Sequence, residues 1–154
     1  MPTEVIRPKF DILRGWPNGS AYDKTFDRVV DGSGAELKIR QGSFVTFDAQ
    51  GRATPATVGT GATALLPLWL VIEGNDETDS YAGDFLDKCV AIKGAYEALF
   101  STTMFTAGAY APNVQVTVVA GKVAVAAPGT NDGVNGYVTA YDATAGELRV
   151  AFTL

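Results

Sequence analysis

The sequence contains no histidine among its 154 residues. Histidine is the commonest general base at neutral pH and the usual imidazole ligand of protein-bound metals. Its absence excludes Ser-His-Asp and Cys-His catalytic sites, and it leaves zinc only one cysteine and carboxylates, a poor donor set for that metal. We therefore expect no catalytic residue, no metal site and no cofactor, and we expect that the chain is not an enzyme.

Cysteine is nearly absent as well, since Cys89 is the only one. A single cysteine cannot form an internal disulfide, which excludes a small secreted scaffold held together by bridges. Its neighbours, in the order Asp-Lys-Cys-Val-Ala-Ile-Lys, are typical of a strand with one buried face. We predict that Cys89 is a buried, structural residue.

Charge is also scarce, because Asp, Glu, Lys and Arg make up 19% of the chain against about 25% in an average soluble domain. The 12 basic residues are outnumbered by 17 acidic ones, for a net charge of -5. This balance disfavours a nucleic-acid partner, which needs clustered Lys and Arg. The hydrophobic fraction of 47% is high for a soluble monomer and favours a subunit interface.

Long apolar runs are missing too. The longest stretch, Ala62–Ile72, is far too short for a membrane-spanning helix, and the first ten residues lack the apolar centre of a signal peptide. We expect a soluble protein, made in a cytoplasm, without a membrane partner.

Residues 1–22 read as an extended arm, because they contain three of the seven prolines, which disfavour helix. The arm nevertheless carries many large apolar side chains, so it must lie on its own domain or on a neighbouring subunit. Residues 23–154 are predicted to form a single β-rich domain. The arm residues that we expect to contact a protein are Ile6, Phe10, Ile12, Leu13 and Trp16.

Short segments with alternating apolar residues recur between turn signals beyond the arm, as expected of strands with one buried face. The fold class predicted is all-β, a small β-barrel or sandwich of short antiparallel strands with at most one short helix, at Asp84–Cys89 or Tyr96–Phe100. The predicted strands are Phe26–Asp31, Glu36–Arg40, Ser43–Asp48, Leu65–Glu73, Lys88–Lys93, Tyr96–Ser101, Val114–Val119, Lys122–Ala126, Gly136–Tyr141 and Glu147–Thr153.

Four further features of the sequence are more specific. Ala120-Gly121 is predicted to be a two-residue hairpin turn and Asp142–Gly146 a longer one. The near-continuous apolar run Leu65–Glu73 predicts a central strand buried on both faces. The Thr, Ala and Gly-rich segment Ala53–Ala64 predicts a long surface loop, of the kind that often contacts partners.

Three motifs with possible chemistry have simpler interpretations. A glycine-rich stretch at Gly59–Ala64 fits the loose dinucleotide pattern, but no strand precedes it and no helix follows. Asn18-Gly19-Ser20 matches a glycosylation sequon and is better read as a turn. An acidic group is interpreted as a solvated turn, with a calcium site as the alternative; its members are Glu73, Asp76, Glu77, Asp79 and Asp84.

The aromatic residues leave a sugar-stacking function open. Trp69 lies within the apolar run and is predicted to be a core residue, whereas Trp16 on the arm is the better candidate for a partner contact.

Several segments together resemble one family of phage proteins. The hairpin motif y-x-x-G-x-x-v-t-v-x-x-G-k-l is similar to Ala109–Val123, although Asn113 replaces the usual turn glycine; asparagine tolerates the same left-handed backbone. The motifs G-y-V and g-x-L-x-v are similar to Gly136–Ala140 and Gly146–Val150, and Gln41–Gly51 resembles a related G-x-x-V-x-x-d-x-x-G element. This succession resembles the small β-barrel head decoration, or cement, proteins of tailed bacteriophages.

The resemblance implies a virion structural protein that binds between major capsid protein subunits and stabilises the head. It also implies a trimer, an arm that drapes over neighbouring subunits, and a location on the capsid surface after synthesis in the host cytoplasm. Two alternatives stay open: a phage tail, connector or baseplate component, and a carbohydrate-binding module. An enzyme with a carboxylate or metal site is disfavoured by the missing histidine.

Overall fold

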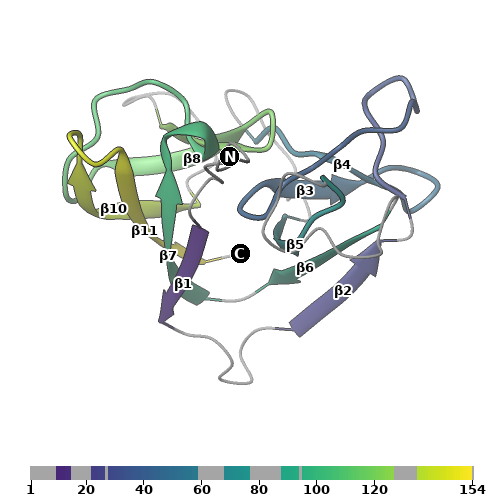
Figure 1. Cartoon of the computed structure of the whole chain (residues 1–154), viewed down its shortest axis with the longest axis horizontal. Helices are drawn as coiled ribbons and strands as arrows, with labels where there is room; N and C mark the ends of the chain where they lie inside the picture. The colour runs from purple at the N-terminus through teal and green to yellow at the C-terminus, as the bar shows by residue number, and fades with distance from the viewer. Residues whose placement is uncertain are drawn as a thin grey trace, which may run out of the picture.

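The computed structural model describes residues 10–14, 22–26, 28–58, 68–76, 88–93, 95–126 and 135–153. Within these residues the protein is all-β, and the only helix is a single 3-10 turn, η1 (Thr102–Met104). Two antiparallel sheets pack in a sandwich-like arrangement that does not close into a barrel (Figure 1). The all-β prediction is confirmed, in its sandwich form.

The two sheets contain all eleven strands of the described residues, and every pair of neighbouring strands is antiparallel. The first sheet has the order β1 (Phe10–Arg14), β7 (Ala95–Ser101), β11 (Glu147–Thr153), β10 (Gly136–Asp142), β8 (Gln115–Val119) and β9 (Lys122–Val125). The second has the order β2 (Tyr22–Phe26), β6 (Cys89–Lys93), β5 (Trp69–Glu73), β3 (Phe44–Phe47) and β4 (Ala53–Pro55).

One long run of chain joins the two sheets. Only residue 94 separates β6 from β7, so the chain passes directly from the second sheet to the first. The two N-terminal strands run antiparallel to this part of the chain: β1 pairs with β7, and β2 pairs with β6 (Figure 1). The N-terminal strands therefore form one edge of each sheet.

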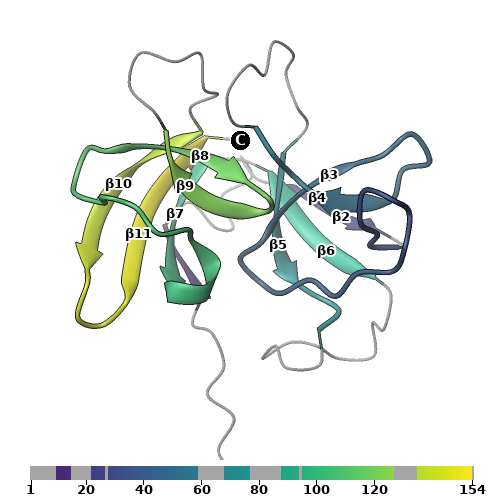
Figure 2. The same cartoon turned by 90° about the horizontal axis from the view of Figure 1, so that it is seen from above.

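A second junction is made by the β8–β9 hairpin (Figure 2), whose turn is hydrogen-bonded to residues of the other sheet. Phe44 N donates a hydrogen bond to Gly121 O, and Gly121 N donates to Ala56 O, both at 2.8 Å. Ala120 and Gly121 have φ values of 49° and 78°, as the two central residues of a type I′ hairpin turn require. The predicted two-residue turn is confirmed, and the backbone groups of Gly121 link the sheets.

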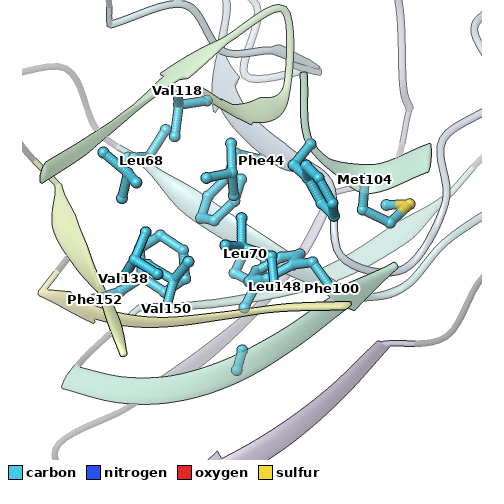
Figure 3. Close-up of a cluster of buried hydrophobic side chains, with 14 of the residues drawn as sticks. Phe44, Leu68, Leu70, Phe100, Met104, Val118, Val138, Leu148, Val150 and Phe152 are labelled. Carbon is cyan, nitrogen blue, oxygen red and sulfur yellow. The ribbon is translucent and has the colours of Figure 1, made fainter. Parts of the chain in front are cut away.

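The main core lies between the two sheets and includes a group of packed aromatic rings (Figure 3). Phe44 from the second sheet lies 6.1 Å from Phe100 and 5.1 Å from Phe152, measured between ring centroids. Phe44 and Phe100 are fully buried, and truncating a side chain of this kind to alanine costs about 3–5 kcal/mol. This shared core holds the two sheets face to face.

The other face of the second sheet is buried under residues 28–40. Val45, Trp69 and Cys89 belong to this smaller cluster, together with Val29 and Ile39 from the covering segment. Strand β5 therefore contributes to both cores: Leu70 faces the main core, whereas its neighbours face the smaller one. The prediction of a central strand buried on both faces is confirmed for the described residues of that run.

Two strand predictions near the start of the domain are wrong. The strand predicted at Phe26–Asp31 lies earlier, at Tyr22–Phe26, and Val29 and Val30 form only isolated bridges. The segment Glu36–Arg40 is not a strand, because the side chain of Asn75 takes the place of a ladder partner.

The long surface loop predicted at Ala53–Ala64 is also corrected. Its first residues form β4, and both Ala53 and Ala56 are fully buried. The chain here passes against the β8–β9 hairpin, where Val58 N donates a hydrogen bond to Val118 O at 2.8 Å. Small side chains are needed for this close approach, so their abundance reflects packing rather than exposure. Positions 59–64 lie outside the described residues.

Candidate functional site

A surface cleft of about 470 Å³ lies where the junction between the sheets meets the segment that covers the smaller core. Its volume is in the range of small-molecule and cofactor pockets, roughly 300–1,000 Å³. The cleft is lined by residues 37–40, residues 103–104, residues 120–122, Ser43, Pro55 and Asp76. We refer to it as the junction cleft.

Asn75 holds one wall of the junction cleft in place. Its side-chain amide accepts a hydrogen bond from Ile39 N at 2.7 Å and donates one to Leu37 O at 3.0 Å. The backbone N–H of Asn75 also donates to Ile39 O at 3.1 Å. Gly74 precedes it because a Cβ there would overlap the carbonyl oxygen of Ile39. The wall is therefore an ordered backbone segment, although it is not a strand.

Buried apolar residues form the floor of the cleft, and the β8–β9 turn forms the opposite wall. Ile39 and Met104 are both nearly fully buried and contribute apolar surface to the lining. The turn at Ala120 and Gly121 is held by the bonds that join the sheets and by a hydrogen bond from Ala120 N to Thr57 Oγ1 at 2.9 Å. The junction cleft is thus lined by backbone that is hydrogen-bonded within the fold.

Cations dominate the charged lining of the cleft. Arg40 Nε lies 3.1 Å from Asp76 Oδ2 in a partly buried ion pair, and Lys38 Nζ donates a hydrogen bond to Asn75 O at 3.3 Å. Lys122 is exposed at the start of β9. The described lining therefore has three cations and one anion, in a chain whose net charge is -5.

The structure places three of the five predicted arm residues, all in β1. Phe10 is half-buried against the chain's own main core, 5.4 Å from Phe100 between ring centroids. Ile12 and Leu13 belong to the same strand, which pairs with β7. Ile6 and Trp16 lie outside the described residues. Of these side chains, Phe10 therefore contacts its own domain.

A close fit explains why Phe10 docks at this position. Gly42 has φ of 87°, and a Cβ on it would lie 2.9 Å from Phe10 Cδ2 and 3.1 Å from Met104 Cε. Only glycine leaves room for both side chains and tolerates this backbone conformation. The glycine of the Gln41-Gly42 turn therefore fixes β1 against the core.

The acidic group corresponds only in part to a solvated turn. Asn75 is 4% exposed and Asp76 is ion-paired, so the turn begins inside the fold. Glu73 ends β5, whereas Glu77, Asp79 and Asp84 lie outside the described residues. Within the described part of the chain, no three acidic or cysteine side chains gather as metal ligands.

Trp69 and Cys89 are buried, as predicted. Trp69 packs edge-on against Phe26, with centroids 6.0 Å apart, and Lys93 Nζ lies 5.3 Å from its ring. Trp69 therefore cannot form an exposed sugar platform. Desolvation raises the pKa of the Cys89 thiol to about 12, which makes it a poor nucleophile at neutral pH.

Exposed aromatic surface is found elsewhere, on strand β10. Tyr137 is 49% exposed, whereas the next residue, Val138, is fully buried. Tyr137 pairs with Ala151 on one side and Gln115 on the other. Tyrosine is enriched among residues that dominate binding energy at interfaces, so Tyr137 is a second candidate contact.

Sequence reasoning missed Asn75 and the junction cleft. Asn75 sits in an acidic segment, and its buried amide gave no local signal because its partners lie 36 and 38 positions away. The glycine before it was the only sign of a close backbone approach.

Comparisons with protein-family models, with curated proteins and with solved structures found no match. In the described part of the chain, no helix has the length and apolar character needed to cross a membrane.

Proposed function

We propose that this protein is a non-catalytic virion component, a decoration protein that binds between major capsid protein subunits and stabilises the head of a tailed phage. In this proposal it lies on the capsid surface and assembles as a trimer, as the family resemblance implies. Its action is mechanical, because contacts that span subunit boundaries must break together before the shell can open.

The observation that carries the proposal is the arrangement of the resembling segments. The resembling segments of the C-terminal part form β8, β9, β10 and β11, which are consecutive along the chain and lie side by side in the first sheet, whereas Gln41–Gly51 contains β3 of the second sheet. The turn positions also agree with the motif, since Asn113 and Gly146 have φ values of 73° and 66°. Both are left-handed conformations of the kind that the motif's turn glycines adopt. The C-terminal motifs thus belong to one continuous part of the first sheet.

Two further features support a role in protein binding. Tyr137, the central residue of the G-y-V motif, is exposed on the sheet surface. The strand β1 joins the sheet edge through backbone pairing, which is also the way in which an extended arm adds to a neighbouring sheet. The exposed side chain of Tyr137 and the edge strand β1 are both suited to contacts with a large protein partner.

The test is a quantitative mass-spectrometric count of the chain in purified virions of the phage that encodes it, relative to the major capsid protein. A decoration protein is expected at a ratio of about one to one, because it occupies every symmetric site. A few copies per particle would instead assign it to the tail, connector or baseplate. Complete absence would reject a virion role.

A matched pair of variants tests the contact surface. Tyr137→Ala should lower the occupancy of purified capsids, because a tyrosine that anchors an interface contributes more than about 2 kcal/mol. Tyr141→Ala is the control, since this tyrosine packs on Phe105 and Tyr110 at centroid distances of 6.3 Å and 5.7 Å. Equal loss for both variants, or no loss for Tyr137→Ala, would remove Tyr137 from the contact.

A further inference from the structure

The described lining of the junction cleft has a positive balance of charge, whereas the chain as a whole has a negative one. The whole chain has 17 acidic and 12 basic residues, yet the described lining of the cleft contains Lys38, Arg40 and Lys122 against a single acid, Asp76. A local reversal of this kind concentrates anionic partners, because opposite charge attracts them and the acidic surroundings repel them from other sites.

The cleft also contains apolar surface next to these cations. Ile39 and Met104 are 5% and 3% exposed, and Pro55 is half-buried; all three belong to the lining. An apolar side chain can pack here while a neighbouring carboxylate meets a lysine at the rim. A free small anion would satisfy only the rim, whereas a peptide with alternating acidic and apolar residues satisfies both features.

We propose that the junction cleft binds an acidic segment of a partner polypeptide. The segment presents carboxylates to Lys38 and Lys122 and an apolar side chain to Ile39 and Met104. The inference rests on the proposed function, in which the partner is a capsid subunit, and it names the chemistry of the part of that subunit that is recognised.

Both walls of the cleft are hydrogen-bonded within the fold, so a partner can bind without a large rearrangement of the backbone. One wall is held by the amide of Asn75, and the other by the backbone bonds between Gly121 and the second sheet. The cations therefore stand on backbone segments that are already ordered before binding, and less conformational entropy is lost on association.

The experiment is an NMR titration of the full chain with a hexapeptide of alternating glutamate and leucine. We expect saturable shifts of the backbone amides of Lys38, Thr103, Gly121 and Lys122. The double variant Lys38→Glu/Lys122→Glu should lose at least about tenfold in affinity and should instead bind the corresponding hexapeptide of lysine and leucine. This exchange of preference separates a binding defect from a folding defect, because a misfolded variant binds neither peptide.

A control variant with the same net charge is Arg28→Glu/Arg149→Glu, whose two arginines are exposed outside the cleft lining. It should bind the acidic peptide with unchanged affinity. Equal weakening in both double variants would overturn the proposal, because the attraction would then be a property of overall charge. An oligothymidylate that shifts the same amides as strongly as the acidic peptide would overturn the assignment to a polypeptide.

Capsid binding separates this inference from the proposed function. If capsids bind wild-type chain and Lys38→Glu/Lys122→Glu chain equally, the cleft is not the contact and the decoration role is retained. If the wild-type chain is absent from virions but the cleft binds the acidic peptide with the expected exchange of preference, the cleft assignment is supported and the decoration role is rejected.

Discussion

The side chain of Asn75 accepts a hydrogen bond from the backbone N–H of Ile39 at 2.7 Å, and this contact joins two segments that are 36 residues apart. Both residues are almost completely buried. The bond orders the segment that covers the smaller core and forms one wall of the junction cleft, so a single amide links core stability to the candidate binding site.

Replacement of Asn75 by alanine is expected to destabilise the fold by about 2–3 kcal/mol, because it leaves the N–H of Ile39 and the carbonyl of Leu37 without this partner. The measurement is the midpoint of urea-induced unfolding. Ser33→Ala is the comparison, since it removes one exposed hydrogen bond, from the Ser33 hydroxyl to Asp31 at 2.7 Å; its midpoint should fall by clearly less than that of Asn75→Ala. A midpoint for Asn75→Ala close to the wild-type value would contradict the structural role.

Gly42→Ala should destabilise the protein by at least about 2 kcal/mol, for two reasons. An alanine would be strained in the left-handed backbone conformation of this position, and its methyl group would lie too close to Phe10. Gly51→Ala is a matched control: Gly51 has φ of 77°, with nothing within 4 Å of the added Cβ. It should cost only the backbone strain, about 1 kcal/mol. The double variant Phe10→Ala/Gly42→Ala should lose less stability than the sum of its single variants. Strict additivity would show that β1 does not dock as described.

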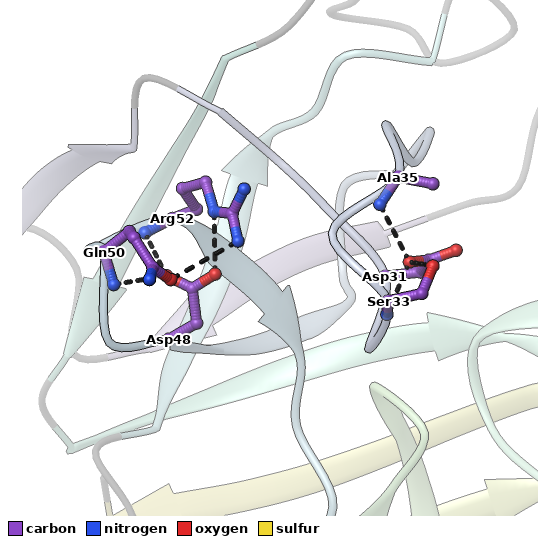
Figure 4. Close-up of polar contacts among 6 residues, drawn as sticks. All are labelled: Asp31, Ser33, Ala35, Asp48, Gln50 and Arg52. Carbon is purple, nitrogen blue, oxygen red and sulfur yellow. Dashed lines mark hydrogen bonds and ion pairs between the residues drawn. The ribbon is translucent and has the colours of Figure 1, made fainter.

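The carboxylates of Asp31 and Asp48 accept hydrogen bonds within their own turns (Figure 4). These bonds predict how the stability of the fold depends on pH. Hydrogen bonds from the Ser33 side chain and from the backbone of Ser33 and Ala35 lower the pKa of Asp31 below its ordinary value of 3.8. Since the folded pKa is the lower one, the stabilisation is present above the ordinary value and is lost as pH falls through the folded value.

Unfolding midpoints measured between about pH 6 and pH 2 should therefore fall more steeply in wild type than in Asp31→Ala at the acidic end. Asp48 behaves similarly, because its bonds to Arg52 and Gln50 outweigh its desolvation and its pKa is lowered. Parallel pH profiles for wild type and Asp31→Ala would show that these turn bonds do not stabilise the fold.

The thiol of Cys89 should not react with a disulfide reagent in the native protein at about pH 8, because burial raises its pKa to about 12 and the thiolate is the reactive form. The same thiol should react fully in denaturant. Rapid labelling under native conditions would mean that the smaller core opens readily at β6.

The boundaries of several elements were predictable from local pattern. Strand β11 coincides with the predicted Glu147–Thr153, and the turn at Ala120-Gly121 has the predicted conformation. In these places alternation and turn chemistry act on neighbouring residues, so a short window of sequence contains the relevant interactions. The same applies to Asn113, whose left-handed backbone is confirmed.

Prediction was less successful where a distant partner decides the structure. Glu36–Arg40 has the alternation of a strand, but the N–H of Ile39 and the carbonyl of Leu37 bond to the side chain of Asn75 and not to a neighbouring strand. The small residues of Ala53–Val58 read as a surface loop, although they lie against the β8–β9 hairpin. The proline content of residues 1–22 gave no indication of where Phe10 lies, and only the fold shows that its ring packs against Gly42 and Met104.

The sequence by itself determined the all-β class, the burial of Cys89 and Trp69, and most strands of the C-terminal half, because periodicity and turn residues act locally. The tertiary structure alone decided which segments meet: the docking of β1 on β7, the bonds of Gly121 to the second sheet, and the clustering of cations in the junction cleft. These contacts join residues far apart in the chain, and their free energy arises only when the two sheets enclose their common core.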